Sequence, residues 1–356
     1  MQQLIRRLAR STRPLRGERG ASAVVVALVL IPVLGVVALA VDGGALYYEK
    51  AKLQNGADAA ALAVAARCAR GLPTCSTTAY GSDVGAVADQ NDDVDGLQTV
   101  SAVAFPGGTG SSPVLATTRT RTSGGGGLRH PFVSALNAAL GQPDSAATFV
   151  TASATASWSA PSSAADVLPL AFSLCGLQSA LSSGTKILLR SDNNNGSTSC
   201  SAADGHPIAG GFGWLDGTTC SSTLSVNGLA ASDQGNDLPS RCNGLISPEQ
   251  LIGRVIEVPI FDCAASAAGT CLTQVGNHTG TQKVDRYRIY GFAAFKVAGH
   301  RLTGTDMATD ASYTGSLRCT GNCRGIQGTF VRWNFTGPTS QTPGPDLGAA
   351  VVRLTR

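Results

Sequence analysis

The chain carries little charge, and most of that charge lies at one end. Charged residues make up only 14% of its 356 residues. Six arginines and one glutamate give residues 1–19 a charge of +5, so the rest of the chain is near neutral, at −1, within a formal total of +4. A near-neutral body lacks the basic surface that phosphate backbones require, which argues against nucleic acid as a partner.

Signatures of common catalytic and metal sites are also missing. The sequence has no H-E-x-x-H pair and no G-x-S-x-G turn, which excludes the usual zinc-peptidase and nucleophile-elbow patterns. Its four histidines are widely separated, at His130, His206, His278 and His300. We therefore expect no cofactor, no metal ion and no enzymatic activity.

One long segment has no charged side chain at all, from Ala21 to Val41. A helix of this length rises about 30 Å, the thickness of the hydrocarbon core of a bilayer. Arginine is retained on the cytoplasmic side, so the basic leader at 1–20 should stay inside and the remainder should be exported. The sequence predicts a single-pass protein of a bacterial plasma membrane, with a cytoplasmic N-terminus and an extracytoplasmic C-terminal domain.

A cleaved secretory signal is the alternative for this segment. Ala38-Leu39-Ala40 has the small-residue pattern of a cleavage site. The apolar run is longer than the usual signal, however, and helix-favouring sequence continues beyond it. A retained anchor is the preferred interpretation.

The helix is expected to continue as a stalk over residues 42–70. Small and apolar residues recur there at helical spacing: Leu46, Leu53, Ala57, Ala60, Ala61 and Val64. Gly43-Gly44 offers a hinge just outside the bilayer, and Gly71 followed by Pro73 should end the helix.

A small α+β head is predicted for residues 71–160. Strands are expected at 97–103, 114–120 and 149–158, with a short helix at 132–140. An acidic loop at 91–96 approaches a calcium-binding pattern, but Ala102 occupies the position of the bidentate glutamate, which favours a simple acidic turn.

A Cys-rich, mainly β domain is predicted for residues 161–337, so the whole chain is of the α+β class. Its best strands are expected at 255–261, 287–297 and 328–335, rich in β-branched and aromatic residues. Residues 338–356 are predicted as a flexible tail that includes a terminal strand.

Ten cysteines in an exported chain are expected to form five disulfides. Three pairs are close neighbours: Cys68–Cys75, Cys263–Cys271 and Cys319–Cys323. The partners of Cys175, Cys200, Cys220 and Cys242 stay open. The spacing of Cys319 and Cys323 also fits half of a zinc site, but no second Cys/His pair lies near.

Several strings resemble the N-terminal region of TadE/TadG-like proteins of the tight-adherence (Flp) pilus machinery. They are Glu18-Arg19-Gly20-Ala21, Ala40-Val41-Asp42-Gly43, Leu46-Tyr47 and the run from Leu53 to Ala63. Later strings, including 168–171, 211–216, 258–262, 291–295 and 319–330, are similar to a high-GC bacterial subgroup. Five lysines among 27 basic residues, with abundant alanine and glycine, also indicate a high-GC bacterium.

The resemblance implies a pilin-like anchor helix and an accessory, non-catalytic role in assembling or displaying a surface pilus. Processed pilins of this system carry a glutamate five residues after the glycine at which they are cleaved. If Gly20 is that glycine, the corresponding position in this chain is Val25. This departure favours a permanent anchor. The metal-binding D-x-S-x-S string of larger TadG-type proteins is absent, so that metal is not expected.

A helix-partner interface is the candidate functional surface. Its residues are Asp42, Leu53, Gln54, Asn55, Asp58 and Leu62. They lie where the helix leaves the lipid bilayer, and they would contact pilus-assembly membrane components or pilin-like subunits. Two other interpretations stay open: Asp42 could simply mark the exit into water, and the alanine-rich helix could pack against its own head.

Two rival functions are also considered. A membrane-tethered adhesin or ligand-binding module would use the Asn/Gly-rich loops. An extracytoplasmic hydrolase would need a convergent polar site between Cys175 and Cys323, which the sequence does not reveal.

Overall fold

The structure is a computed structural model of the whole chain. It describes residues 19–71, 75, 98–108, 111–120, 127–143, 147–183, 186–190, 200–202, 205–208, 211–233, 238–244, 251–272, 284–302, 311–335 and 343–355. The leader at 1–18, the acidic loop at 91–96 and the sequence just after Gly337 lie outside these ranges. The expectations for those segments stay untested.

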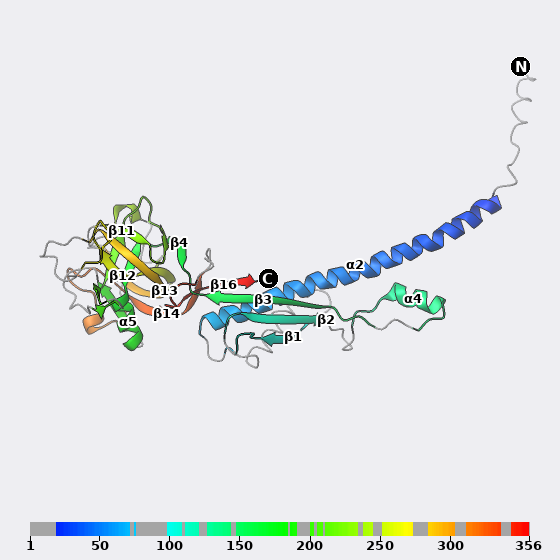
Figure 1. Cartoon of the computed structure of the whole chain (residues 1–356), viewed down its shortest axis with the longest axis horizontal. Coiled ribbons are helices and arrows are strands. Elements are labelled where there is room, and N and C mark those ends of the chain that lie inside the picture. The colour runs from blue at the N-terminus through cyan, green and yellow to red at the C-terminus, as the bar shows by residue number, and fades with distance from the viewer. Residues whose placement is uncertain are drawn as a thin grey trace, which may run out of the picture. The chain divides into compact units, whose positions relative to one another are not determined.

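The first element is one long helix, α2 (Arg19–Ala69), of 51 residues. Figure 1 shows it as a single continuous ribbon, unbroken at Pro32 and at the Gly43-Gly44 pair. Proline and glycine are tolerated better in a membrane helix than in a soluble one. The predicted continuation of the apolar run as one helix to about residue 70 is confirmed, and the hinge considered at Gly43-Gly44 is not a break in that helix.

The first half of α2 is apolar on every side up to Asp42, and no large side chain of this run is buried against the residues that the structure describes. Its large side chains are exposed, from 49% at Val41 to 68% at Val36. Within the described residues, α2 is the one helix long and apolar enough to span a membrane. A helix that is hydrophobic all round requires an apolar solvent, and a bilayer supplies one.

Contacts divide the chain into two compact units whose segments alternate along the sequence. The first comprises Met1–Ala57, Gly85–Ser101 and Thr117–Ser153; the second comprises Asp58–Val84, Ala102–Ala116 and Ala154–Arg356. The domain boundaries placed near residues 71, 161 and 338 stay a prediction.

A five-stranded sheet has the order β1-β2-β3-β16-β15. Its strands are β1 (Gln98–Ala104), β2 (Val114–Thr120), β3 (Thr151–Ser159), β16 (Ala349–Thr355) and β15 (Trp333–Phe335). The expected short helix is α4 (Pro131–Ala139), between β2 and β3. The terminal strand β16 lies between β3, which is antiparallel to it, and β15, which is parallel, so this part of the C-terminal segment is built into a sheet.

The second unit contains a seven-stranded sheet with the order β11-β9-β5-β12-β13-β14-β6. Its strands are β5 (Leu170–Ser173), β6 (Ile187–Arg190), β9 (Phe212–Leu215), β11 (Leu229–Asp233), β12 (Val255–Ala265), β13 (Arg286–Arg301) and β14 (Gly325–Val331). Strand β11 also pairs with the start of β13, which closes β5, β9, β11, β13 and β12 into a ring. The smaller elements are β4 (Ser163–Val167), α5 (Leu174–Ser183), β7 (Cys200–Ser201), β8 (Pro207–Ile208), β10 (Ser222–Ser225) and the 3-10 turns η1 (Ser240–Cys242) and η2 (Gly315–Leu317).

Aromatic side chains fill the core of this second unit. Trp214, Phe172 and Phe295 are each 1% exposed or less, and the rings of Phe172 and Phe295 meet edge to face at 5.1 Å. Such rings bury large apolar areas. The chain has few aromatic residues, and many of them lie on or beside β5, β9, β12 and β13 in this core.

The strand expected at 328–335 is two strands that belong to different sheets. β14 ends at Val331 and pairs with β13, whereas β15 begins at Trp333 and pairs with β16. Arg332 lies between them, and its guanidinium forms an ion pair with Asp346 at 2.6 Å. A continuous run of strand-forming residues does not show where the chain changes sheet, so the sequence prediction was wrong here.

All ten cysteines are paired, in the second unit. The three neighbouring pairs predicted from spacing are confirmed, and the remaining four cysteines form Cys175–Cys200 and Cys220–Cys242. Cys319 and Cys323 therefore bond to each other, which overturns the zinc alternative for this pair.

The cost of removing each disulfide should follow the length of the loop that it closes. Cys175–Cys200 spans 25 residues and Cys319–Cys323 spans 4. In the chain-entropy model, replacing both cysteines by serine costs about 3.5 kcal/mol for the longer loop and about 2 kcal/mol for the shorter one. Urea unfolding of the two double variants measures the difference. Equal losses would show that the entropy of the unfolded chain does not control what each disulfide contributes.

Candidate functional site

Where α2 belongs to the first unit, one face of it packs against strands of its own chain. Leu53 and Ala57 are fully buried. The hydroxyl of Thr118, on β2, donates a buried hydrogen bond of 2.8 Å to the carbonyl oxygen of Leu53. A threonine side chain reaches the helix backbone because small residues at Gly56 and Ala57 let the strand approach closely.

Polar side chains hold the edge of this packed face. The side-chain amide of Gln54 donates to the carbonyl oxygen of Ser153 at 3.2 Å. The ammonium group of Lys50 donates to the carbonyl oxygen of Thr151. Both acceptors lie on β3, so Gln54 acts within its own chain and is not wholly available to a partner.

Asp42, at the end of the apolar run, is turned toward its own chain. It is only 5% exposed, and its Oδ2 accepts a 2.9 Å hydrogen bond from the backbone N–H of Val133. Val133 lies in the first turn of α4, where backbone N–H groups lack helical partners and the helix dipole favours an anion. His130 precedes α4 without a capping side chain, so Asp42 supplies the missing acceptor from a distant position.

The opposite side of α2 is open. Tyr47 is 79% exposed and Tyr48 is 60% exposed, and the ammonium group of Lys52 lies 4.7 Å from the centre of the Tyr48 ring. Ala51 and Asn55 are exposed on the same helix. Of the six predicted interface residues, Asp42 and Leu53 are buried, Gln54, Asp58 and Leu62 are half-buried, and Asn55 is exposed.

In the second unit the last turns of α2 are held by Asn334 on β15 and by Arg332, the residue just before β15. Ala60, Ala61, Val64 and Ala65 are fully buried. The amide of Asn334 donates to the carbonyl oxygen of Ala66 at 2.7 Å, and Arg332 donates to that of Ala69 at 3.4 Å. The Ala69 carbonyl group is among those that a helix C-terminus leaves without helical partners, whereas the Ala66 carbonyl group also accepts a 3.3 Å hydrogen bond from the backbone N–H of Arg70. Gly71 follows with a φ of +65°, the left-handed conformation that ends many helices, as predicted.

Comparison with known families gives one match, and it falls on this helix. Residues 20–67 match the sequence model of the family described as "Putative Flp pilus-assembly TadE/G-like". The N-terminal helix is a TadE/G-like segment. No curated protein and no solved structure matches the chain. The resemblance noted in the sequence is thus confirmed over residues 20–67, and the match covers that helix alone.

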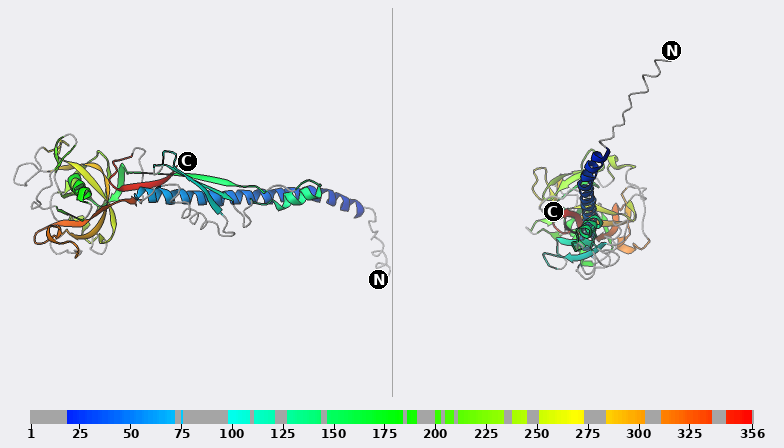
Figure 2. Two further views of the ribbon diagram at one scale, coloured as in Figure 1. Left: turned by 90° about the horizontal axis from the view of Figure 1, so that it is seen from below. Right: turned by 90° about the vertical axis from the view of Figure 1, so that its right-hand side faces the viewer.

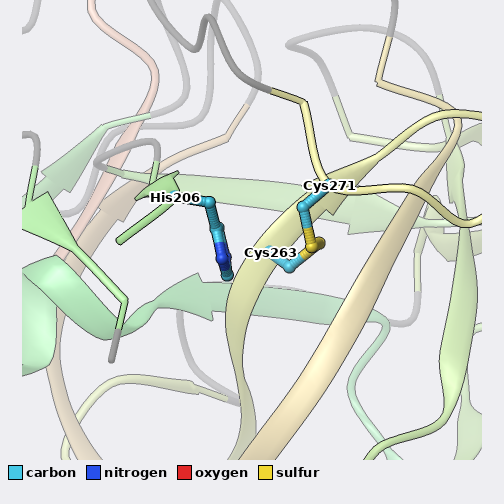
Figure 3. A group of neighbouring side chains, drawn as sticks. All are labelled: His206, Cys263 and Cys271. Atoms are coloured by element: carbon cyan, nitrogen blue, oxygen red, sulfur yellow. A yellow bond between two sulfur atoms is a disulfide. The ribbon is translucent and has the colours of Figure 1, made fainter. Parts of the chain in front are cut away.

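Outside the TadE/G-like segment, one group of side chains among the described residues has metal-ligand composition. Figure 3 shows His206 beside Cys263 and Cys271. The two sulfurs are bonded to each other, and a metal ligand must be a thiolate. The Nε2–H of His206 donates to the carbonyl oxygen of Asp262 at 2.9 Å, which fixes the ring against β12. In the oxidised protein this cluster is structural.

The neighbouring carboxylate is also engaged. The guanidinium of Arg288, on β13, donates two hydrogen bonds of 2.9 and 2.8 Å to the two oxygens of Asp262. This bidentate geometry is among the stronger ion-pair arrangements. Asp262 therefore joins β12 to β13 and is not a free base for catalysis.

A polar surface groove lies beside β9, β10 and β11. Its lining includes the carboxylates of Asp166 and Asp216 and several hydroxyls, and both carboxylates are exposed. The groove would be the place for the alternative ligand-binding role. Exposed carboxylates are common on protein surfaces, so the groove does not favour ligand binding over the pilus-assembly role.

Glu257, on β12, has a carboxyl oxygen that is buried without a hydrogen-bond partner. Burial disfavours the ionised form and raises the pKa of Glu257 from its ordinary value of 4.5 to about 7. Sequence reasoning gave no sign of this group, because an isolated glutamate in a strand usually faces water.

The stability of the second unit should depend on this carboxyl group. The folded state holds the Glu257 proton more tightly than the unfolded chain, so its contribution is full below about pH 4.5 and is lost as the pH rises to about 7. The loss is at most about 3 kcal/mol, and less where water reaches the group.

Glu257→Gln keeps the shape and removes the titration. We expect this variant to flatten the dependence on pH and to be more stable than the original chain at pH 8. Urea unfolding midpoints at pH 5 and pH 8 measure both effects. An unchanged slope in the variant would contradict the assignment.

Proposed function

We propose that this protein is a membrane-anchored accessory component for assembling or displaying a Tad/Flp-type pilus, and that it is not an enzyme. The observation that carries this proposal is the TadE/G-like match on a helix whose first half is apolar and has exposed large side chains. The second half of the same helix continues without a break into a packed stripe. Such a helix joins a bilayer to a folded exported body.

Partner binding is assigned to the open side of α2, which carries Tyr47, Ala51 and Asn55. Small residues beside a membrane exit allow the helix of a neighbouring subunit to approach closely. Exposed tyrosines suit the boundary between lipid and water, and they supply contact area at interfaces. This assignment moves the candidate surface away from Leu53, which the chain uses for its own packing.

The orientation that we propose has the N-terminus in the cytoplasm. The leader carries Arg6, Arg7, Arg10, Arg13, Arg16 and Arg19 ahead of the apolar run. The ten cysteines, all paired, favour an oxidising compartment for the body. Both observations support export of everything after α2 leaves the bilayer.

Charge placed on the open side of α2 should weaken partner binding without unfolding the protein. We expect the double variant Ala51→Glu, Asn55→Glu to recover at least about tenfold less pilus-assembly membrane component by co-purification, since burying two unpaired carboxylates easily exceeds the 1.4 kcal/mol per factor of ten. Lys296→Glu, an exposed charge change on β13, is the matched control. Undiminished recovery of the same components by the double variant would contradict this surface.

A reporter that is active only outside the cytoplasm tests the topology. Fused after Arg356 of the full-length chain, it should be active, and the same reporter fused before Met1 should be silent, because the basic leader resists translocation. The reverse pattern would refute the proposed orientation. Silence at both ends would show that the chain does not cross the membrane.

A further inference from the structure

Helix α4 exposes its largest apolar side chains, which is unusual for a helix in water. Val133, Ser134 and Asn137 are half-buried on the side toward the chain. Phe132, Leu136 and Leu140 face outward and are 46%, 51% and 64% exposed. They follow one another at a spacing of four, so they form one apolar stripe, which we call the α4 stripe.

The position of α4 is fixed at two points within the first unit. Its first turn is hydrogen-bonded to Asp42, the residue that closes the apolar run. Leu128 and Thr148 exchange backbone hydrogen bonds of 2.8 and 3.0 Å at the base of the segment, and His130 meets the Thr148 hydroxyl at 2.8 Å. Figures 1 and 2 both show α4 beside the half of α2 that is nearer the N-terminus. The first turn of α4 therefore lies at Asp42, where the apolar run ends, and the helix lies beside that run.

The surroundings of α4 have the composition of a membrane surface. Tyr47 and Tyr48 are exposed within two turns of Asp42, and aromatic rings of this kind gather at the level of lipid headgroups. Arg129 is exposed just before α4, where it can meet anionic headgroups. Phe149 is 44% exposed, with the Arg119 guanidinium 3.8 Å from its ring centre.

We propose that the α4 stripe is a second membrane contact, which lies in the outer interfacial layer of the bilayer beside the exit of α2. The occupant of this surface is lipid: the upper acyl chains meet Phe132, Leu136 and Leu140, and the headgroups meet Arg129. Charged side chains are costly in the hydrocarbon centre, and Arg129 is exposed just before α4, so the contact is interfacial. This inference rests on the proposed anchoring of α2.

The contact would fix the rotation of α2 in the membrane. A single helix is free to rotate about its axis and to tilt. A second contact on one side of α2, joined to it through Asp42, would hold the open side with Tyr47 and Asn55 in one constant direction. Neighbouring subunits in the bilayer would then meet that surface from a defined direction.

Photocrosslinking of the full-length protein in vesicles of phosphatidylethanolamine and phosphatidylglycerol tests the contact. A benzophenone amino acid is placed at Leu136, at Val29 or at Leu229 in separate preparations. Val29 is 55% exposed in the apolar run and Leu229 is 42% exposed on β11 in the second unit, so the three positions have similar exposure. Benzophenone bonds to C–H groups that it touches, and intact mass separates lipid adducts from protein adducts.

We expect lipid adducts at Leu136 on the order of tenfold above those at Leu229, and approaching those at Val29. Adducts at Val29 but not at Leu136 would overturn the inference and leave the anchor standing. A cross-linked dimer from Leu136 would assign the α4 stripe to a second copy instead, and an internal cross-link would assign it to the chain itself; either overturns the lipid contact. Absence of lipid adducts at Val29 would refute the anchor.

The triple variant Phe132→Ser, Leu136→Ser, Leu140→Ser supplies an independent measurement. Because these side chains are exposed, the thermal unfolding midpoint in detergent should not fall. In vesicles, hydrogen exchange at the α4 amides should become several-fold faster than in the original chain, since helical amides shielded by lipid open to water less often. Equal exchange rates in the two proteins would contradict the membrane contact.

Discussion

One helix has two halves with opposite needs, and the rest of the structure depends on how it meets them. Before Asp42, α2 is apolar on every side and is long and apolar enough to span a bilayer. After it, a single stripe of mostly small residues from Leu53 to Ala69 is buried against the chain's own strands. Because the helix continues through both halves without a break, the apolar run and the packed stripe share one backbone.

The small side chains of the packed stripe explain how strands can cover a helix with so few large residues. Alanine contributes little apolar area, so the gain per residue is modest. In exchange, the helix backbone comes within reach of polar side chains, as in the contact of Thr118 with Leu53 and of Asn334 with Ala66. Hydrogen bonds to helix carbonyls therefore replace part of the packing that bulky side chains would provide.

Disulfides make a second contribution to stability. Closing a loop of the unfolded chain costs conformational entropy, and a disulfide removes part of that cost from folding. All five disulfides lie in the second unit, whose aromatic core includes Phe172, Trp214 and Phe295. The disulfides and the aromatic core therefore stabilise the same unit.

The sequence predicted what local periodicity and proximity decide. The extent of α2, its end at Gly71, most strands and three of five disulfides follow from spacing of a few residues. It did not predict pairings between distant segments. The change of sheet at Arg332, the bond between Cys175 and Cys200 and the buried carboxyl group of Glu257 depend on residues that only the folded chain brings together.

Asp42 shows most clearly why the sequence could indicate the candidate surface but could not determine what each of its residues contacts. An aspartate at the end of an apolar run fits an exit into water, a partner contact or an internal hydrogen bond, and the string of residues around it is the same in each case. Its acceptor role is set by Val133, 91 positions away. That one bond joins α2 to α4, so the charged residue that closes the apolar run also holds α4 and its exposed apolar stripe beside that helix.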